Sequence, residues 1–211
     1  METNKKLIVG FLNKHIKQFL ILKKYANRTG HPVPSDSKYF SQILVTLLTG
    51  IRGIDRQKGA DLSDNSDVKA ALVWDAIDTP RFNGCIKAGT KSSSSDSMIS
   101  LDEQPNLYLV LWDVVEDKNI PRCRVWSVNT QEDSVFREMC SKWYEKRAND
   151  EIKSTNFQLH PPRNKNSNII RNTCGNLQYP LFFEAHYIND SYIIKKLDHQ
   201  VVKYGRCNKV D

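Results

Sequence analysis

Apolar residues recur every three or four positions in two stretches near the N-terminus, a spacing that places their side chains on one face of a helix. The first stretch predicts a helix over residues 4–26, with apolar positions at Leu7, Ile8, Phe11, Leu12, Ile16, Phe19 and Leu20. The second predicts a helix that begins near Ser35 or Asp36, either of which can cap it, and ends at Gly50 and Gly53. Its apolar face holds Phe40, Ile43, Leu44, Leu47 and Leu48.

Strands are predicted farther along the chain by runs of β-branched and aromatic residues. The clearest runs are 107–115 and 122–128, and a helix is predicted over residues 133–148. Weaker strand signals lie at 155–159, 179–187 and 192–197, and the serine-rich segment 90–100 predicts a surface loop. Helices and strands in this order indicate a mixed α/β or α+β fold.

A tight β-hairpin is predicted where residues 59–62 and 67–74 flank a short polar turn. A four-residue loop would turn Asp61 away from Asp67, whereas a three-residue loop, 63–65, would pair them. Asn65 tolerates the left-handed conformation that a three-residue loop needs at its end, so we expect that loop. It would place the two carboxylates side by side, roughly 5 Å apart at Cβ. Lys69 would project on the same face, because residues two apart in a strand do so.

Paired carboxylates repel each other unless a cation or a proton lies between them. Mg²⁺ suits Asp61 and Asp67, because it prefers oxygen ligands and keeps several waters. Lys69 beside such an ion can hold or deprotonate a water, which is the equipment for hydrolysing a phosphodiester. The spacing alone is a weak pattern, and the alternative interpretation is a solvated turn, where Asp, Asn and Ser are common.

The segment Asp61…Asp67-Val68-Lys69 resembles the PD-(D/E)XK signature of type II restriction endonucleases and related nucleases. The resemblance implies that Asp61 and Asp67 bind Mg²⁺, for which Mn²⁺ can substitute, and that Lys69 assists the nucleophilic water. Here Ala60 stands in place of the proline, and the second acid is Asp rather than the commoner Glu. Many members carry a further Glu on an early helix, but the second helix here has no acid after its cap region.

The resemblance also implies a fold, a restriction-endonuclease-like core with a central mixed β-sheet flanked by helices. The resemblance to this family extends loosely over residues 36–160. We therefore expect a single nuclease domain over residues 1–211. Its expected parts are an N-terminal helical part at 1–50, a catalytic core at 54–160 and C-terminal strands at 161–211.

Charge is distributed unevenly along the 211 residues, whose formal net charge is +7. Residues 1–60 carry a balance of +8, residues 61–150 carry −5 and residues 151–211 carry +4. Basic surface around an acidic centre fits a metal-dependent enzyme that holds phosphates with Lys and Arg. The candidate DNA-binding residues flank the acids, and Arg and Asn can also read guanine and adenine. They are Arg52, Arg56, Lys58, Arg81, Asn83 and Lys87.

Several other classes of protein are disfavoured. No apolar run approaches the roughly 20 residues of a membrane span, and the N-terminus lacks the pattern of a signal peptide. The five cysteines include no C-x-x-C pair, which favours reduced thiols, no structural zinc site and a cytoplasmic protein. No Walker-type loop or Ser-His-Asp order is evident. His15 lies among apolar helix positions, which favours a structural role. His160 opens a polar loop that could touch DNA.

The leading hypothesis is therefore a Mg²⁺-dependent type II restriction enzyme that cuts a short site in double-stranded DNA. A symmetric site would be read by a homodimer, with one active site for each strand. One alternative is a structure-specific PD-(D/E)XK nuclease of the resolvase or repair type. The other is a basic DNA-binding module without catalytic activity, in which Asp61 and Asp67 are only turn residues.

Overall fold

The computed structural model describes residues 4–206 and 208–210, apart from 32, 34–35, 55–59, 87–97, 117 and 165. The segments predicted as helices at 4–26, 35–50 and 133–148 are the helices α1 (Lys5–Thr29), α2 (Lys38–Thr49) and α4 (Ser134–Ala148). Asn4 and Asp133 cap α1 and α4 with their side chains, and Ser37 occupies the cap position of α2. Gly50 ends α2 in the left-handed conformation, with φ of 75°.

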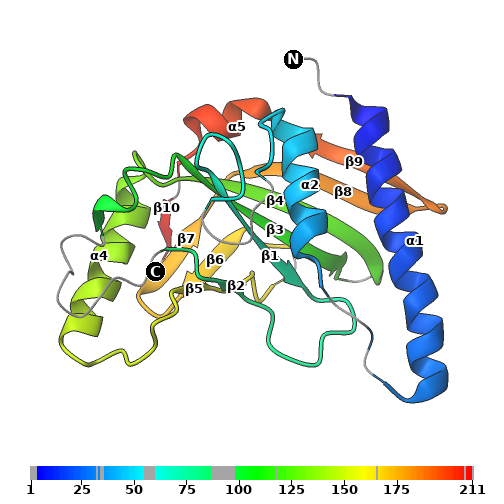
Figure 1. The fold of residues 1–211 in the computed structure, drawn as a ribbon, viewed down its shortest axis with the longest axis horizontal. Coiled ribbons are helices and arrows are strands. Elements are labelled where there is room, and N and C mark those ends of the chain that lie inside the picture. Colours follow the sequence, from blue (N-terminus) through cyan, green and yellow to red (C-terminus); the bar gives the residue numbers. More distant parts are fainter. Residues whose placement is uncertain are drawn as a thin grey trace.

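A five-stranded mixed sheet forms the centre of the molecule, with strand order β1-β3-β4-β8-β9 (Figure 1). The edge strand β1 (Asp67–Leu72) runs parallel to β3 (Asn106–Val115). The other neighbours are antiparallel: β4 (Ile120–Asn129), β8 (Leu181–Ile188) and β9 (Ser191–Leu197). This mixed α/β architecture, with a central sheet flanked by helices, confirms the fold class that the sequence predicted.

Both faces of the sheet are covered, because alternate residues of β3 belong to two separate cores. Tyr108, Val110 and Trp112 pack toward α1 and α2, together with side chains such as Leu12 and Leu44. The intervening residues Leu107, Leu109 and Leu111 pack on the opposite face, in the core that α4 joins through Phe136, Met139, Cys140, Trp143 and Tyr144. Burial on both faces explains why β3 appears in the sequence as a nearly continuous apolar run.

Several short elements of the structure were not predicted from the sequence, and one predicted strand is shorter than expected. The strand expected at 155–159 is only β5 (Gln158–Leu159), which pairs with β2 (Phe82–Asn83). The missed elements are β6 (Ile169–Asn172), β7 (Gly175–Gln178), β10 (Asn208–Val210) and α5 (His199–Tyr204). They are too short and too polar to give a periodic signal.

The cysteines behave as the sequence analysis expected within the described residues. Cys85, Cys123 and Cys140 are buried, Cys174 is half-buried, and all four are free thiols. Burial raises the pKa of the Cys85 thiol to about 12. Cys207 lies outside the described residues. No helix in the described ranges is long and apolar enough to cross a membrane.

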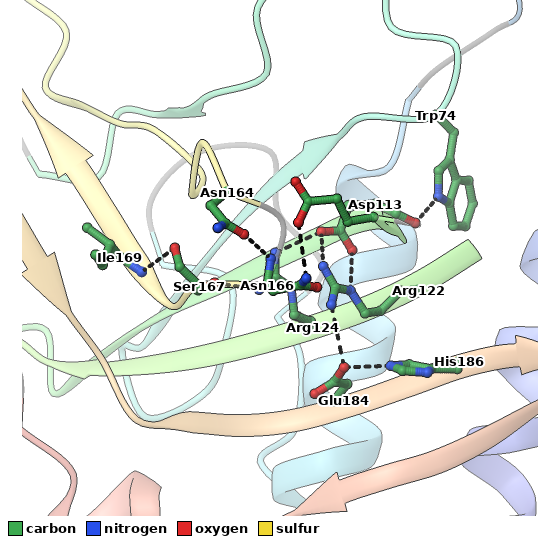
Figure 2. Close-up of polar contacts among 11 residues, drawn as sticks. Trp74, Asp113, Arg122, Arg124, Asn164, Asn166, Ser167, Ile169, Glu184 and His186 are labelled. Carbon is green, nitrogen blue, oxygen red and sulfur yellow. Dashed lines mark hydrogen bonds and ion pairs between the residues drawn. The ribbon is translucent and has the colours of Figure 1, made fainter. Parts of the chain in front are cut away.

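A buried ionic network crosses the sheet on the α4 face, at the end of β3 (Figure 2). Asp113 accepts two hydrogen bonds from Arg122, at 2.9 and 2.8 Å, and one from Arg124 at 2.7 Å. Glu184 joins the network through Arg122, whose Nη1 lies 3.7 Å from Glu184 Oε1, and His186 Nε2 lies 2.5 Å from the same oxygen. Because Arg122 lies opposite Asp113 in the β3–β4 register, the strand pairing brings opposite charges together. Removing one member would leave its partner charged and buried.

His15 lies in an aromatic cage, with its ring centroid 4.2 Å from that of Phe40 and 4.3 Å from that of Trp112. Its side chain is 5% exposed, and its Nδ1 has no hydrogen-bond partner among the described residues. Burial lowers the pKa of His15 from 6.5 to about 4. The structural role expected for this residue is consistent with that environment.

We expect His15 to make the fold sensitive to acid. Between pH 6.5 and 4 the unfolded chain binds the proton and the folded chain does not, so stability falls as the pH is lowered. The full loss is about 3 kcal/mol. Chemical unfolding of wild type and His15→Phe at pH 7 and pH 4.5 measures it. The variant should lose less stability than wild type over this interval, and the exposed control His31→Gln should match wild type. Equal acid sensitivity in His15→Phe would exclude His15 as the cause.

Candidate active site

A tight turn places Asp61 beside the start of β1. The backbone N–H groups of Asp61 and Leu62 both donate to the carbonyl of Ser66, at 3.2 and 3.1 Å. Asn65 adopts the left-handed conformation, with φ of 69°. Asp64 fixes the turn, because its carboxylate accepts hydrogen bonds from the backbone N–H and the hydroxyl of Ser66. The three-residue loop 63–65 and the role of Asn65 are therefore confirmed.

The wider hairpin prediction is wrong. β1 does not pair with the segment that carries Asp61 but joins the central sheet, parallel to β3. The Asp61 segment instead runs against residues 53–54: Leu62 forms an isolated antiparallel bridge with Gly53, and Ile54 N–H donates to the Asp61 carbonyl. Pairing with β3 buries Val68 and Ala71 in two different cores, which a free hairpin could not do.

The turn still brings the two carboxylates together. The single backbone N–H of Val68 donates to Asp61 Oδ2 at 3.0 Å and to Asp67 Oδ1 at 2.9 Å. Lys69 Nζ lies 2.7 Å from Asp67 Oδ2, so residues two apart on β1 share a face as the sequence analysis expected. The side chains of Lys69 and Asp67 are 22% and 14% exposed, which leaves the group open to solvent on one side.

The charge state of Asp67 reflects this crowding. Burial, followed by the hydrogen bond and negative charge of Asp61, raises the pKa of Asp67 from 3.8 to about 6, although Lys69 opposes the shift. Ionised Asp67 therefore lies in a site that favours an added positive charge.

Gln42 of α2 is a member of this site that the sequence analysis missed. Its Nε2 donates to Asp61 Oδ1 at 2.6 Å, so both oxygens of Asp61 are held by hydrogen bonds. Gln42 lies 19 residues before Asp61, and only the packing of α2 against β1 brings it there. No spacing rule along the sequence could have identified it. It lies on the early helix where the resemblance led us to look for a further acid.

A cavity of about 560 Å³ runs along the free edge of β1. Lys69 lines it together with Arg81 and Asn83, two of the residues that the sequence analysis proposed for DNA contact. Arg81 forms an ion pair with Asp78 at 2.6 Å, and Asn83 Oδ1 accepts from Asn156 at 3.2 Å. Lys38, at the start of α2, also lines this cavity. The cavity thus joins candidate catalytic and candidate binding residues.

The remaining candidates for DNA contact are only partly placed. Arg52 is exposed, and its carbonyl accepts a hydrogen bond from Ser63 N–H at 2.8 Å, which places its backbone against the turn that carries Asp61. Arg56, Lys58 and Lys87 lie outside the described residues.

Among the described residues, Asp61 and Asp67 are the candidate metal ligands that lie together. In the part of the chain that the structure describes, no group of three or more His, Cys, Asp or Glu side chains is arranged to hold a metal ion. Asp61 and Asp67 are two adjacent carboxylates, which are the oxygen donors that a hard divalent cation prefers. The donor set therefore fits an ion that takes its other ligands from water and substrate.

Comparison with known proteins supports the nuclease hypothesis. Residues 24–194 match the MamI restriction endonuclease family. The chain belongs to this family. The match to the MamI family includes the turn, β1 and the residues that line the β1 cavity.

A curated relative has the same family name. It is the type II restriction enzyme MamI of Microbacterium ammoniaphilum, which is 31% identical to this chain over 180 residues. The aligned region covers 80% of this chain but only 58% of that relative, so the chain matches little more than half of its length. No solved structure matches the chain.

Proposed function

We propose that this chain is a divalent-metal-dependent, sequence-specific endonuclease that hydrolyses phosphodiester bonds in double-stranded DNA as a type II restriction enzyme. The observation that supports it most strongly is the convergence of Asp61, Asp67 and Lys69 beside an open cavity. Membership of the MamI restriction endonuclease family supports the same activity. As a domain proposal, residues 1–211 act as one nuclease domain.

Asp61 and Asp67 would hold the divalent cation, either Mg²⁺ or Mn²⁺. When bound, such an ion polarises a phosphoryl oxygen and stabilises the leaving oxygen. Gln42 and the Val68 N–H fix Asp61 from two directions, so this carboxylate needs little reordering before it binds a cation. Asp64 instead has a structural role, because its carboxylate holds the turn through two hydrogen bonds from Ser66.

Lys69 is the group that handles the attacking water. Its Nζ is held by Asp67 at 2.7 Å, and its side chain lines the β1 cavity. From this position the ammonium group can orient the water and stabilise its developing negative charge. In-line attack then forms the new bond to phosphorus while the opposite phosphorus–oxygen bond breaks; the attacking water gives up its proton to solvent, and the leaving oxygen takes a proton from solvent.

The basic residues around the cavity would hold the DNA. Arg52, Arg81 and Asn83 are the described candidates, and Arg56, Lys58 and Lys87 belong to the same proposal. A chain with one such site cuts one strand, so cleavage of both strands at a symmetric sequence requires a homodimer.

A digest of phage DNA tests the proposed function. Purified protein is incubated with the DNA in Mg²⁺, with parallel reactions in EDTA, with Mn²⁺ and with Lys69→Ala. Discrete fragments that appear with wild type in either metal and vanish in both controls are the expected result. Cleavage of branched DNA alone would instead indicate a structure-specific nuclease. Binding without cleavage of linear or branched DNA in any metal would indicate a module without catalytic activity.

Gln42→Ala should weaken use of the metal more than it weakens folding. Loss of the bond to Asp61 Oδ1 frees this carboxylate to rotate, and loss of such supporting contacts typically costs about 10–100-fold in metal affinity or activity. Cleavage rates measured against Mg²⁺ concentration should show a higher half-saturating concentration. Gln200→Ala, at an exposed position of helix α5, is the matched control. An unchanged Mg²⁺ dependence in Gln42→Ala would remove Gln42 from the site.

A further inference from the structure

The β2–β5 ladder connects the β1 cavity to a second basic segment. Phe82 pairs with Leu159 and Asn83 with Gln158, and the chain continues directly from β5 into His160. His160 then forms a bridge with Arg171, with N–H···O distances of 2.7 and 3.0 Å in the two directions. The two ladders therefore carry Arg171 toward the rim of the cavity that Arg81 lines.

Arg81 and Arg171 lie near the His160 ring, and Arg163 lies near Arg171. We call these three residues the arginine cluster. The ring hydrogen-bonds to the backbone of Pro80, and burial together with the charges of Arg171 and Arg81 lowers the pKa of His160. Burial is the main cause that lowers the pKa of Arg171, and the charge of the neighbouring Arg163 lowers it further. His160 therefore lies beside positive charges that disfavour its own protonation.

The cluster has little compensating negative charge. In the described part of the chain, Asp78 is the one carboxylate that pairs with it, through Arg81, and the Asp78 side chain is 72% exposed. Arg171 instead donates two hydrogen bonds to the Pro161 carbonyl, both at 3.1 Å. Like charges held close together raise the free energy of the site until an anion binds.

Hydrogen bonds on both sides of Arg163 hold the loop that carries it. The buried Arg124 of the ionic network donates to the Ser167 carbonyl at 2.8 Å, and Asn166 donates to Glu116 at 3.0 Å (Figure 2). Arg171 fixes the other end through Pro161. Arg163 is exposed between these anchors. A preformed loop loses little conformational entropy when it binds a partner.

We propose that the arginine cluster binds phosphates of the DNA strand that continues beyond the β1 cavity. The inference rests on the proposed function, because it takes the cavity as the place where DNA is cut. Three guanidinium groups suit a series of phosphates, since each can donate paired hydrogen bonds to phosphate oxygens. His160 acts as a positioning residue, because it links the Pro80 backbone to the Arg171 strand.

Salt dependence of DNA binding tests this proposal. Anisotropy of a labelled DNA duplex of mixed sequence is measured in EDTA, so that no cleavage occurs, between about 50 and 200 mM salt. Loss of one phosphate contact lowers the slope of log K against log salt by about 0.9, so Arg163→Gln and Arg171→Gln should each show that change. Arg163→Lys should keep the wild-type slope even if it binds more weakly, because the slope depends on the number of phosphates neutralised and lysine still neutralises one.

Lys195→Gln is the matched control, since Lys195 is exposed on β9, at the opposite edge of the sheet from β1. It removes one charge and should leave the slope unchanged. A wild-type slope in Arg163→Gln, which lies exposed and should fold normally, would overturn the proposal. If Arg163→Gln weakened the binding of an RNA duplex and left the binding of the DNA duplex unchanged, the assignment to DNA would be overturned. Because binding is measured without cleavage, unchanged slopes in a protein that cuts DNA refute only the cluster. Reduced slopes in a protein that never cuts DNA would refute only the proposed nuclease activity and not the arginine cluster.

Discussion

Lys69→Ala should fold, bind DNA and fail to cut it, with a rate lowered by about 10²–10⁴-fold, as is typical when a group that handles a proton or a water is removed. Lys69 is the one cation that contacts the candidate metal ligands in the described structure, with Nζ 2.7 Å from Asp67 Oδ2. Because it lines the cavity beside β1, it can reach a phosphate and its attacking water together.

Single-turnover cleavage of a plasmid, with binding measured separately in EDTA, distinguishes loss of catalytic activity from loss of affinity. Lys38→Ala is the matched control, because Lys38 lines the same cavity from α2 and has no contact to Asp61 or Asp67 among the interactions described. It should cut at nearly the wild-type rate. Lys69→Ala that cuts as fast as Lys38→Ala would remove Lys69 from the catalytic site.

Asp67→Asn should abolish cleavage and yet stabilise the metal-free protein. Without Asp67 the divalent ion loses one of two carboxylate ligands, and several kcal/mol of transition-state stabilisation corresponds to a rate loss on the order of 10³-fold. The stabilisation arises because the pKa of Asp67 is raised to about 6 in the folded state, above its ordinary value of 3.8. The folded state then holds the proton more tightly than the unfolded state, so stability falls as the pH rises from 3.8 to 6 and stays lower above that.

Asparagine resembles the protonated acid at every pH and avoids this loss. At pH 8 in EDTA, Asp67→Asn should unfold at a higher denaturant concentration than wild type, with a gain of up to about 3 kcal/mol. At pH 4 the two proteins should be nearly equal, and added Mg²⁺ should stabilise wild type more than the variant. Asp64→Asn, in the same turn, should keep cleavage. Lower stability of Asp67→Asn at pH 8 would show that the carboxylate pair is not strained.

Local chemistry explains which parts of this molecule could be predicted from its sequence. The helices α1, α2 and α4 follow from apolar spacing and from caps such as Asp133, and the turn before β1 follows from the left-handed tolerance of Asn65. The convergence of Asp61 and Asp67 could be predicted from the sequence, because that turn alone determines it. These features depend on residues only a few positions apart.

The missing parts depend on contacts between distant segments. The parallel pairing of β1 with β3 joins residues about 40 positions apart, and the long buried strand β3 gives no sign of which neighbour it accepts. Gln42 reaches Asp61 only because α2 packs against β1. Likewise, Arg163 and Arg171 approach Arg81 only through β5 and the bridge at His160. Register and packing of this kind are decided by the whole core.

The location of a bound cation decides whether Asp61 and Asp67 form the metal site. Crystals of the protein with duplex DNA are grown with Mn²⁺, in the Lys69→Ala variant so that the DNA stays intact, and the anomalous scattering of manganese is mapped. We expect a manganese peak between the Asp61 and Asp67 carboxylates, with a phosphate oxygen of the DNA beside it. A manganese peak elsewhere, or intact DNA bound away from the β1 cavity, would contradict it.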